Sequence, residues 1–134
     1  MAPSRWHARP RRVVHAASSL ALAQLEKLAQ YGDRSQVPPH VAGCLDVPDD
    51  VLVEVVNPVE LPPYWRRPGP PPRETQALGD AWLARGSTLL LRVPSAVSPP
   101  DANYLLNPLH ADFARCVQSV PEAFEFDARL TRRR

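Results

Sequence analysis

Three side chains near the start of the chain, Arg5, His15 and Glu26, have the types and the spacing to act together on one ligand. Glu26 lies one turn beyond Leu22 and directly after Leu25 in a stretch of helical periodicity, so it borders an apolar face. A carboxylate in that position loses hydration and needs either a polar partner or a chemical role.

The plainer interpretation of Glu26 is a solvated surface acid beside Lys27, which is the commoner situation for a glutamate. In the sharper interpretation, Arg5 lies near the start of a strand, His15 lies at its end, and Glu26 is on the helix that follows. A guanidinium, an imidazole and a carboxylate would then converge. The rest of the chain decides between these two interpretations.

A short strand and a helix are the elements that would position these groups. The run Val13-Val14-His15 is rich in β-branched residues, which is typical of a strand. The hydroxyl groups of Ser18 and Ser19 are good acceptors for the first N–H groups of a helix, and Gly32 is suited to ending it. In between, the apolar residues recur with helical period at Leu22, Leu25, Leu28 and Ala29.

Further strands, a second helix and proline-rich loops make up the middle of the chain. Residues 33–48 have the prolines and glycine of a loop, and the apolar run 51–56 predicts a strand buried on both sides. Residues 75–85 have the apolar spacing of a helix that ends at Gly86. Gly79 inside it weakens the helix by roughly 1 kcal/mol relative to alanine, and such a glycine indicates close packing.

The last third of the chain completes an α+β pattern. Residues 88–93 predict a buried strand, 97–108 are expected to be irregular, 110–117 to form one or two helical turns, and 124–127 to form a terminal strand. This order favours a single α+β domain over residues 1–134, with few helices packed against a mixed β-sheet.

The composition is that of an ordinary globular domain, with 44% hydrophobic and 22% charged residues among 134. No apolar run approaches the roughly 20 residues that span a bilayer, and no apolar segment follows the basic N-terminus as in a secretory signal. Cys44 and Cys116 lack a CxxC spacing, so a reduced, cytoplasmic protein is expected. The net charge of +2 is too small to favour nucleic acid as the main ligand.

Several common catalytic patterns are missing from the sequence. It has no glycine-rich phosphate loop of the GxGxxG or Walker A type, no GxSxG elbow and no HExxH. The four histidines fall on separate predicted elements without the spacing of metal ligands, so no metal site is expected. The common hydrolase and metalloenzyme classes are therefore disfavoured.

Four segments in a fixed order resemble a known family. They are RW-x(6)-VVH-x-A-x-S-LA-x-A-x-LE, TQALGDAWL, LLLRVPSAV and NYLLNP-x-HADFA, and together they resemble the RES-domain proteins, the toxin half of RES–Xre toxin–antitoxin pairs. The resemblance runs from about Arg5 to Leu130. It implies a fold similar to that of ADP-ribosyltransferases and the cleavage of the nicotinamide–ribose bond of NAD⁺. Family members usually carry a further strand upstream, so we expect an N-terminally shortened member.

The same resemblance implies roles for four residues. The family's arginine at the RW step matches Arg5, its helix glutamate matches Glu26, and its serine in RVPS matches Ser95. Its tyrosine at the end of the VVY strand is replaced by His15, which is a departure. Glu26 would stabilise positive charge on the ribose, and Arg5 would clamp the pyrophosphate or a ribose. His15 would stack on nicotinamide, and Ser95 would bind the dinucleotide or position Arg5.

Two functions follow from these observations. The first is a toxin that degrades NAD⁺ as its substrate, needs no other cofactor, and is held in check by an Xre-type helix-turn-helix antitoxin. The second is a catalytically impaired RES domain that binds the antitoxin and tunes transcription of its own operon. Catalysis would be impaired because a charged His15 would oppose the cationic nicotinamide ring. A homodimer is a family expectation, and direct nucleic-acid binding is the least favoured hypothesis. The acceptor of the ADP-ribosyl group stays open between water, phosphate and protein.

Overall fold

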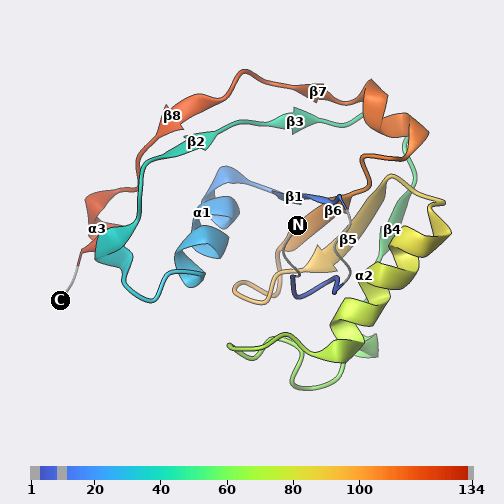
Figure 1. The fold of residues 1–134 in the computed structure, drawn as a ribbon, viewed down its shortest axis with the longest axis horizontal. Coiled ribbons are helices and arrows are strands. Elements are labelled where there is room, and N and C mark those ends of the chain that lie inside the picture. Colours follow the sequence, from blue (N-terminus) through green and yellow to red (C-terminus); the bar gives the residue numbers. More distant parts are fainter. Residues whose placement is uncertain (1–3, 9–11, 133–134) are drawn as a thin grey trace.

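A mixed four-stranded sheet forms the centre of the computed structural model, which describes residues 4–8 and 12–132 (Figure 1). Its strands in spatial order are β1 (Val14–Ala17), β6 (Ala102–Leu106), β5 (Leu90–Pro94) and β4 (Val53–Val55). The β1–β6 and β6–β5 pairs are antiparallel, whereas β4 and β5 are parallel. The predicted α+β class with a mixed sheet is therefore confirmed.

Two longer helices lie on either side of this sheet in Figure 1, α1 (Leu20–Ala29) at the left and α2 (Arg73–Arg85) at the right. The hydroxyl of Ser19 accepts a hydrogen bond from the Leu22 N–H over 3.1 Å and so caps α1, as predicted. The remaining helical elements are short: η1 (Arg34–Gln36), η2 (Pro58–Glu60), η3 (Ala111–Arg115) and α3 (Ala128–Thr131). No helix in the described ranges combines the length and the apolar character needed to cross a membrane.

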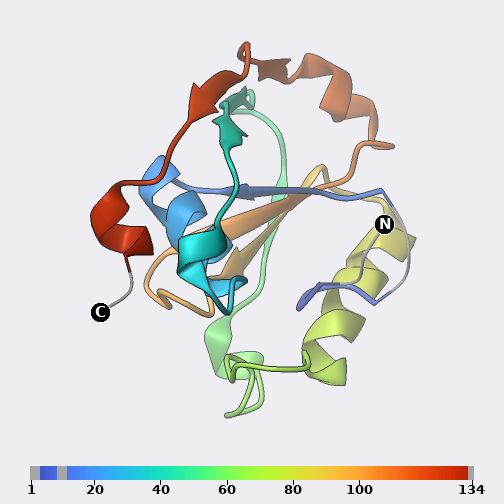
Figure 2. The same ribbon diagram turned by 60° about the vertical axis from the view of Figure 1, so that its left-hand side comes forward.

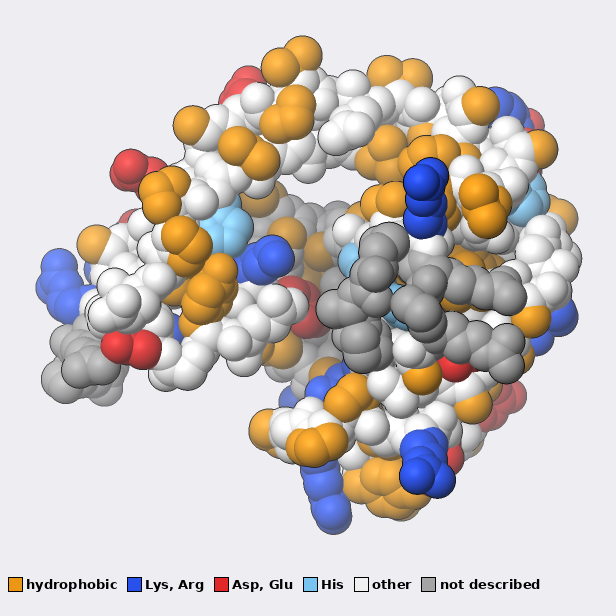
Figure 3. Space-filling model, in the orientation of Figure 1, with side chains coloured by type: hydrophobic (Ala, Val, Ile, Leu, Met, Phe, Trp, Pro, Cys, Tyr) orange, Lys and Arg blue, Asp and Glu red, His pale blue; other side chains and the backbone are white. Residues whose placement is uncertain are grey.

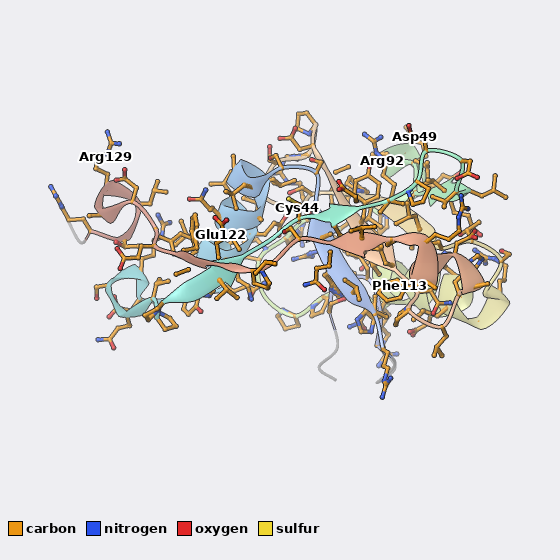
Figure 4. All side chains as sticks on the ribbon, turned by 90° about the horizontal axis from the view of Figure 1, so that it is seen from above. Cys44, Asp49, Arg92, Phe113, Glu122 and Arg129 are labelled. Carbon is orange, nitrogen blue, oxygen red and sulfur yellow. The ribbon has the colours of Figure 1, made fainter. Side chains whose placement is uncertain are left out.

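An arm of two short antiparallel ribbons runs alongside the main sheet. The strands β2 (His40–Ala42) and β8 (Glu122–Phe124) form one ribbon, and β3 (Leu45–Asp46) and β7 (Val117–Gln118) form the other. Seen from above, the arm passes Glu122 and then Cys44 on its way across the molecule (Figure 4). The prediction that 33–48 is only a loop was wrong, because its two strands are specified by partners more than 70 residues away.

The main core lies between one face of the sheet and α2. Trp82 of α2 is fully buried, and its indole Nε1–H donates to the Thr88 hydroxyl over 2.9 Å. Trp6 and Trp65 pack beside it with ring centroids 6.0 Å apart. The other members are apolar side chains from the strands and their connections: Val13, Val56, Leu61, Leu83, Leu91, Val93 and Leu105.

Some sequence predictions were wrong in ways that bear on the site. Residues 97–108 are not irregular throughout, because β6 is a central strand hydrogen-bonded on both sides. The strand predicted at 51–56 is an edge strand, so Val53 and Val55 are exposed rather than buried on both sides. The terminal strand lies at Glu122–Phe124, just before the predicted 124–127. α1 ends at Ala29, before Gly32, with Leu25 exposed.

Candidate functional site

The carboxylate of Glu26 is anchored through one of its two oxygens. Glu26 Oε1 accepts hydrogen bonds from Ser95 Oγ at 2.6 Å and from Asn103 Nδ2 at 2.7 Å. Within the part of the chain that the structure describes, Oε2 receives no hydrogen bond. The anchored oxygen fixes the plane of the carboxylate, which leaves the other oxygen available to a ligand. Glu26 is half-buried and is not the solvated surface acid of the plainer interpretation.

Strand register explains why Ser95 and Asn103 meet the same oxygen. Asn103 of β6 lies opposite Val93 of β5, and Ser95 follows Val93 by two residues. Because side chains alternate along a strand, Val93, Ser95 and Asn103 point to the same face. The Ser98 N–H donates to Ser95 Oγ at 3.0 Å, so the hydroxyl proton of Ser95 is directed toward Glu26. Ser95 itself is fully buried.

Arg5 is held by two backbone carbonyl groups of the segment before α2. Its Nη1 donates to Trp65 O at 2.6 Å and its Nη2 to Arg67 O at 3.2 Å. Partial burial lowers the pKa of Arg5, and the negative charge of Glu26 raises it in part, which shows that the two groups are close enough to interact. Arg5 makes no ion pair with Glu26 in the described residues.

Helix α2 holds the segment that carries Arg5. Thr75 Oγ1 donates to Arg5 O at 2.6 Å, and Gln76 Nε2 donates to Ser4 O at 2.9 Å. One helical turn further along α2, Asp80 Oδ1 accepts a hydrogen bond from the backbone N–H of Ala8, at the other end of the same segment, over 3.2 Å. Figure 2 shows the N-terminal segment lying alongside α2. These contacts fix the backbone from which the Arg5 guanidinium extends.

Gly79 allows the closest approach between α2 and this segment. A Cβ atom at position 79 would overlap the carbonyl oxygen of Trp6, and it would lie 3.6 Å from His7 Cβ. The glycine therefore has a packing reason, as the sequence predicted.

His15 lies on the same face of the sheet as Asn103. It is opposite Leu105 in the β1–β6 register, and Leu105 and Asn103 share one side of β6. The His15 ring packs edge-on against the His7 ring, with centroids 5.3 Å apart and an angle of 70° between planes. Surrounding protein atoms lower the pKa of His15, and positive charge on His7 and Lys27 lowers it further. The neutral imidazole is therefore favoured at neutral pH.

The space-filling view shows a hollow in the middle of the molecule, between the side that carries α1 and the N-terminal side (Figure 3). Acidic, basic and histidine side chains appear on its walls in the space-filling view (Figure 3). A separate pocket of about 360 Å³ opens on the other face of the sheet, and it is lined by residues such as Leu90, Tyr104 and Leu106. Its lining includes neither Glu26 nor Ser95, so this pocket is distinct from the Glu26 site.

The rim of that second pocket carries charge of its own. Asp49 lines it, and the guanidinium of Arg92 lies 5.9 Å from the centroid of the Tyr104 ring. Asp49 and Arg92 are both labelled in Figure 4, on the side of the molecule opposite Arg129 of α3.

The chemistry available on the Glu26 face is charge stabilisation. A carboxylate with one free oxygen can stabilise a nearby cationic centre, and a guanidinium can bind phosphate or hydroxyl oxygens. An uncharged imidazole can pack against a flat ring without repelling a cation. The described residues contain no group of three or more His, Cys, Asp or Glu side chains placed to hold a metal ion.

All four residues singled out from the sequence are placed by this arrangement. Ser95 contacts Glu26 directly, Arg5 interacts with it through charge, and His15 lies on the shared sheet face. Sequence reasoning missed Asn103, because the segment around it was predicted to be irregular. The run Tyr104-Leu105-Leu106, an aromatic residue followed by two apolar ones, was a signal that could have indicated a strand.

Comparison with known proteins identifies the family. A sequence model of the RES domain matches residues 1–128. The chain belongs to the RES domain family. Among its relatives, "Toxin Res" of Yersinia enterocolitica is 36% identical over 127 residues, covering 94% of this chain and 82% of that protein. "Toxin Res" of Pseudomonas putida is also 36% identical, over 129 residues that cover 94% of this chain and 84% of that protein.

A third relative has a name that specifies a chemistry. The "Prs ADP-ribosylating toxin" of Sphingobium is 33% identical over 131 residues, covering 96% of this chain and 81% of that protein. In this RES domain the match to the family model, over residues 1–128, spans Arg5, Glu26 and Ser95. The expected resemblance to the RES family is thus confirmed.

Proposed function

We propose that this RES domain protein is a toxin that consumes NAD⁺ by breaking the bond between nicotinamide and ribose, with ADP-ribosyltransferase-like chemistry. The observation that carries the proposal is the anchored carboxylate of Glu26, whose Oε2 receives no hydrogen bond from the described residues. Relatives named as toxins, one of them as ADP-ribosylating, support the same function.

The proposed reaction develops positive charge on the ribose as nicotinamide departs. The electron pair of the C–N bond leaves with nicotinamide, which becomes neutral, and the ribose carbon becomes cationic until an acceptor adds its own electron pair. Glu26 Oε2 stabilises that cationic ribose and holds one of its hydroxyl groups. The acceptor is water, phosphate or a protein side chain, and with water as acceptor the products are nicotinamide, ADP-ribose and a proton.

Arg5 and Ser95 prepare the site for this step. The guanidinium of Arg5, already oriented by two carbonyl groups, binds the pyrophosphate or a ribose oxygen with its remaining donors. Ser95 is a positioning residue, because it contacts Glu26 Oε1 and lies fully buried beneath the carboxylate. Asn103 acts in the same way from the neighbouring strand.

The partners we propose are the NAD⁺ substrate and an Xre-type helix-turn-helix antitoxin, with a homodimer and a cytoplasmic location as further expectations. A second function is favoured by one observation, the histidine at position 15. If its imidazole binds nicotinamide poorly, the protein is a RES domain without efficient catalysis that binds the antitoxin and tunes transcription of its own operon.

The decisive experiment uses protein made by cell-free synthesis, incubated with NAD⁺ while nicotinamide release is followed by chromatography. We expect release by the wild-type protein and a loss of roughly 100-fold or more in E26Q, since that variant cannot stabilise the cationic ribose. E60Q is the matched control, because Glu60 is exposed on η2, and it should behave as wild type. No release from the wild-type protein, or equal release by E26Q, would contradict the proposal. Antitoxin binding without release would support the regulatory function instead.

A further inference from the structure

His7 is a buried imidazole that none of the roles assigned above uses. Its side chain is only 1% exposed, although it lies in a short segment at the edge of the fold. Its backbone carbonyl accepts from the Ser4 N–H at 2.9 Å, which closes a tight turn around Arg5 and Trp6. Because histidine is seldom fully buried, a buried histidine next to a proposed binding site is a candidate for a role in that site.

The ring of His7 packs directly against the ring of His15. Its centroid is 5.3 Å from that of His15 in an edge-on arrangement, the favoured geometry for two aromatic rings that are not stacked. His15 is an exposed residue, and its ring contact with the buried His7 restrains it. The turn that carries His7 is itself held by Thr75 and by the close approach of Gly79.

The charges around His15 make this contact matter for a cationic ligand. His7 faces it from the N-terminal segment and Lys27 faces it from α1, and both interact with it unfavourably when charged. Glu26 lies beside Lys27 on the same helix, and β6 contributes the uncharged Leu105 opposite His15. Positive charge near the His15 ring therefore disfavours its protonation.

We propose that His7 is a positioning residue for the nicotinamide subsite: it packs edge-on against His15 and holds that ring oriented and uncharged toward the cationic nicotinamide of NAD⁺. This inference deepens the proposed function and rests on it. The lowered pKa of His15 agrees with it. It also explains how a histidine can occupy the place where the resembled family has a tyrosine, which carries no positive charge.

The test compares H7F, which keeps an edge-on aromatic ring but removes the imidazole at position 7, with the wild-type protein. The titration of the His15 ring is followed by NMR, and kcat/KM for NAD⁺ is measured across pH. We expect the pKa of His15 to rise in H7F, so that the loss of kcat/KM on acidification begins at higher pH. A rise of half a pKa unit corresponds to a loss of roughly threefold in kcat/KM on the acid side.

Two controls separate this role from a structural one. H7F in an H15Y background should leave the acid side of the pH profile unmoved, because the titrating partner is gone. H40Q changes a histidine that contacts Tyr31 and Phe126 elsewhere, and it should leave the His15 titration unchanged. Equal loss of kcat/KM at every pH in H7F, with the His15 titration unmoved, would overturn the role of His7.

The failure of the proposed function has a different signature. Absence of nicotinamide release at every pH, together with no NAD⁺-induced change in the His15 resonances, would overturn the substrate assignment and the nicotinamide subsite with it. NAD⁺ cleavage with an unmoved pH profile in H7F would overturn the role of His7 alone.

Discussion

Ser95 Oγ lies 2.6 Å from Glu26 Oε1, although the two residues are 69 positions apart in the chain. The serine follows β5 and the glutamate is on α1, so this hydrogen bond exists only once the sheet and the helix have packed together. A buried donor on a fixed strand end holds a carboxylate more firmly than a solvated one would. The orientation of the Glu26 carboxylate, the proposed catalytic group, therefore depends on correct packing of α1 against the sheet.

Removing either anchor of Glu26 should lower kcat more than it changes KM. In S95A or N103L one hydrogen bond to Oε1 is lost, so the carboxylate is free to rotate, and we expect a loss of roughly 10- to 100-fold in kcat. The double variant should lose less than the product of the two single losses, because both anchors act on one oxygen. Steady-state kinetics of NAD⁺ cleavage measures both quantities.

The matched control for this prediction is S87A. Ser87 Oγ also donates to a glutamate, Glu54 Oε1, over 3.2 Å, but this pair is exposed and remote from the site. S87A should retain wild-type kinetics. Wild-type kcat in S95A and N103L would show that the anchoring of Glu26 has no part in the reaction.

Arg5 should not be replaceable by lysine. The guanidinium reaches the carbonyl oxygens of Trp65 and Arg67 at once, and a single ammonium group cannot reproduce this fork while also binding a ligand. We expect R5K to lower kcat/KM by roughly tenfold or more, and to lower the free energy of unfolding by about 1 kcal/mol.

NAD⁺ kinetics and urea unfolding test this expectation. R12K changes an exposed arginine outside the site and should be neutral in both measurements. Equal kinetics of R5K and R12K would exclude a specific role for the guanidinium.

Gly79 connects the packing of α2 to the site. Because an added Cβ would overlap Trp6 O, G79A must push the segment of Arg5 and His7 away from the helix. We expect a loss of about 2 kcal/mol in the free energy of unfolding, together with a large loss of NAD⁺ cleavage. G32A is the control, since nothing lies within 4 Å of a Cβ at that position. A G79A variant as stable and active as G32A would show that the close approach is not required.

The sequence allowed the local elements to be predicted better than the long-range ones. The helices, the Ser19 cap and the packing role of Gly79 follow from short-range patterns that every helix obeys. Of the strands of the arm, only β8 was predicted, about two residues late; β2, β3 and β7 were missed, since two or three residues become a strand only when a distant partner pairs with them. The central strand β6 was missed because prolines flank it and because Asn103 and Tyr104 interrupt its apolar pattern.

The sequence predicted candidate site residues but not the contacts between them. Arg5, Glu26 and Ser95 were recognised from the family pattern, yet no pattern indicates that Ser95 anchors Glu26 rather than Arg5. That choice depends on the β5–β6 register, a tertiary property. His7 was overlooked because burial of a histidine next to a turn has no sequence signature.

The lowered pKa of His15 makes a prediction about stability against pH. In the unfolded chain this histidine takes up a proton near its ordinary pKa of 6.5, whereas in the folded protein it does so only at lower pH. As the pH falls through this interval the unfolded state binds more protons, so the free energy of unfolding decreases; above 6.5 His15 contributes nothing to the pH dependence. In H15Q this part of the acid destabilisation should disappear. Urea unfolding of both proteins across the interval measures the difference, and parallel curves would show that His15 titrates alike in the folded and unfolded states.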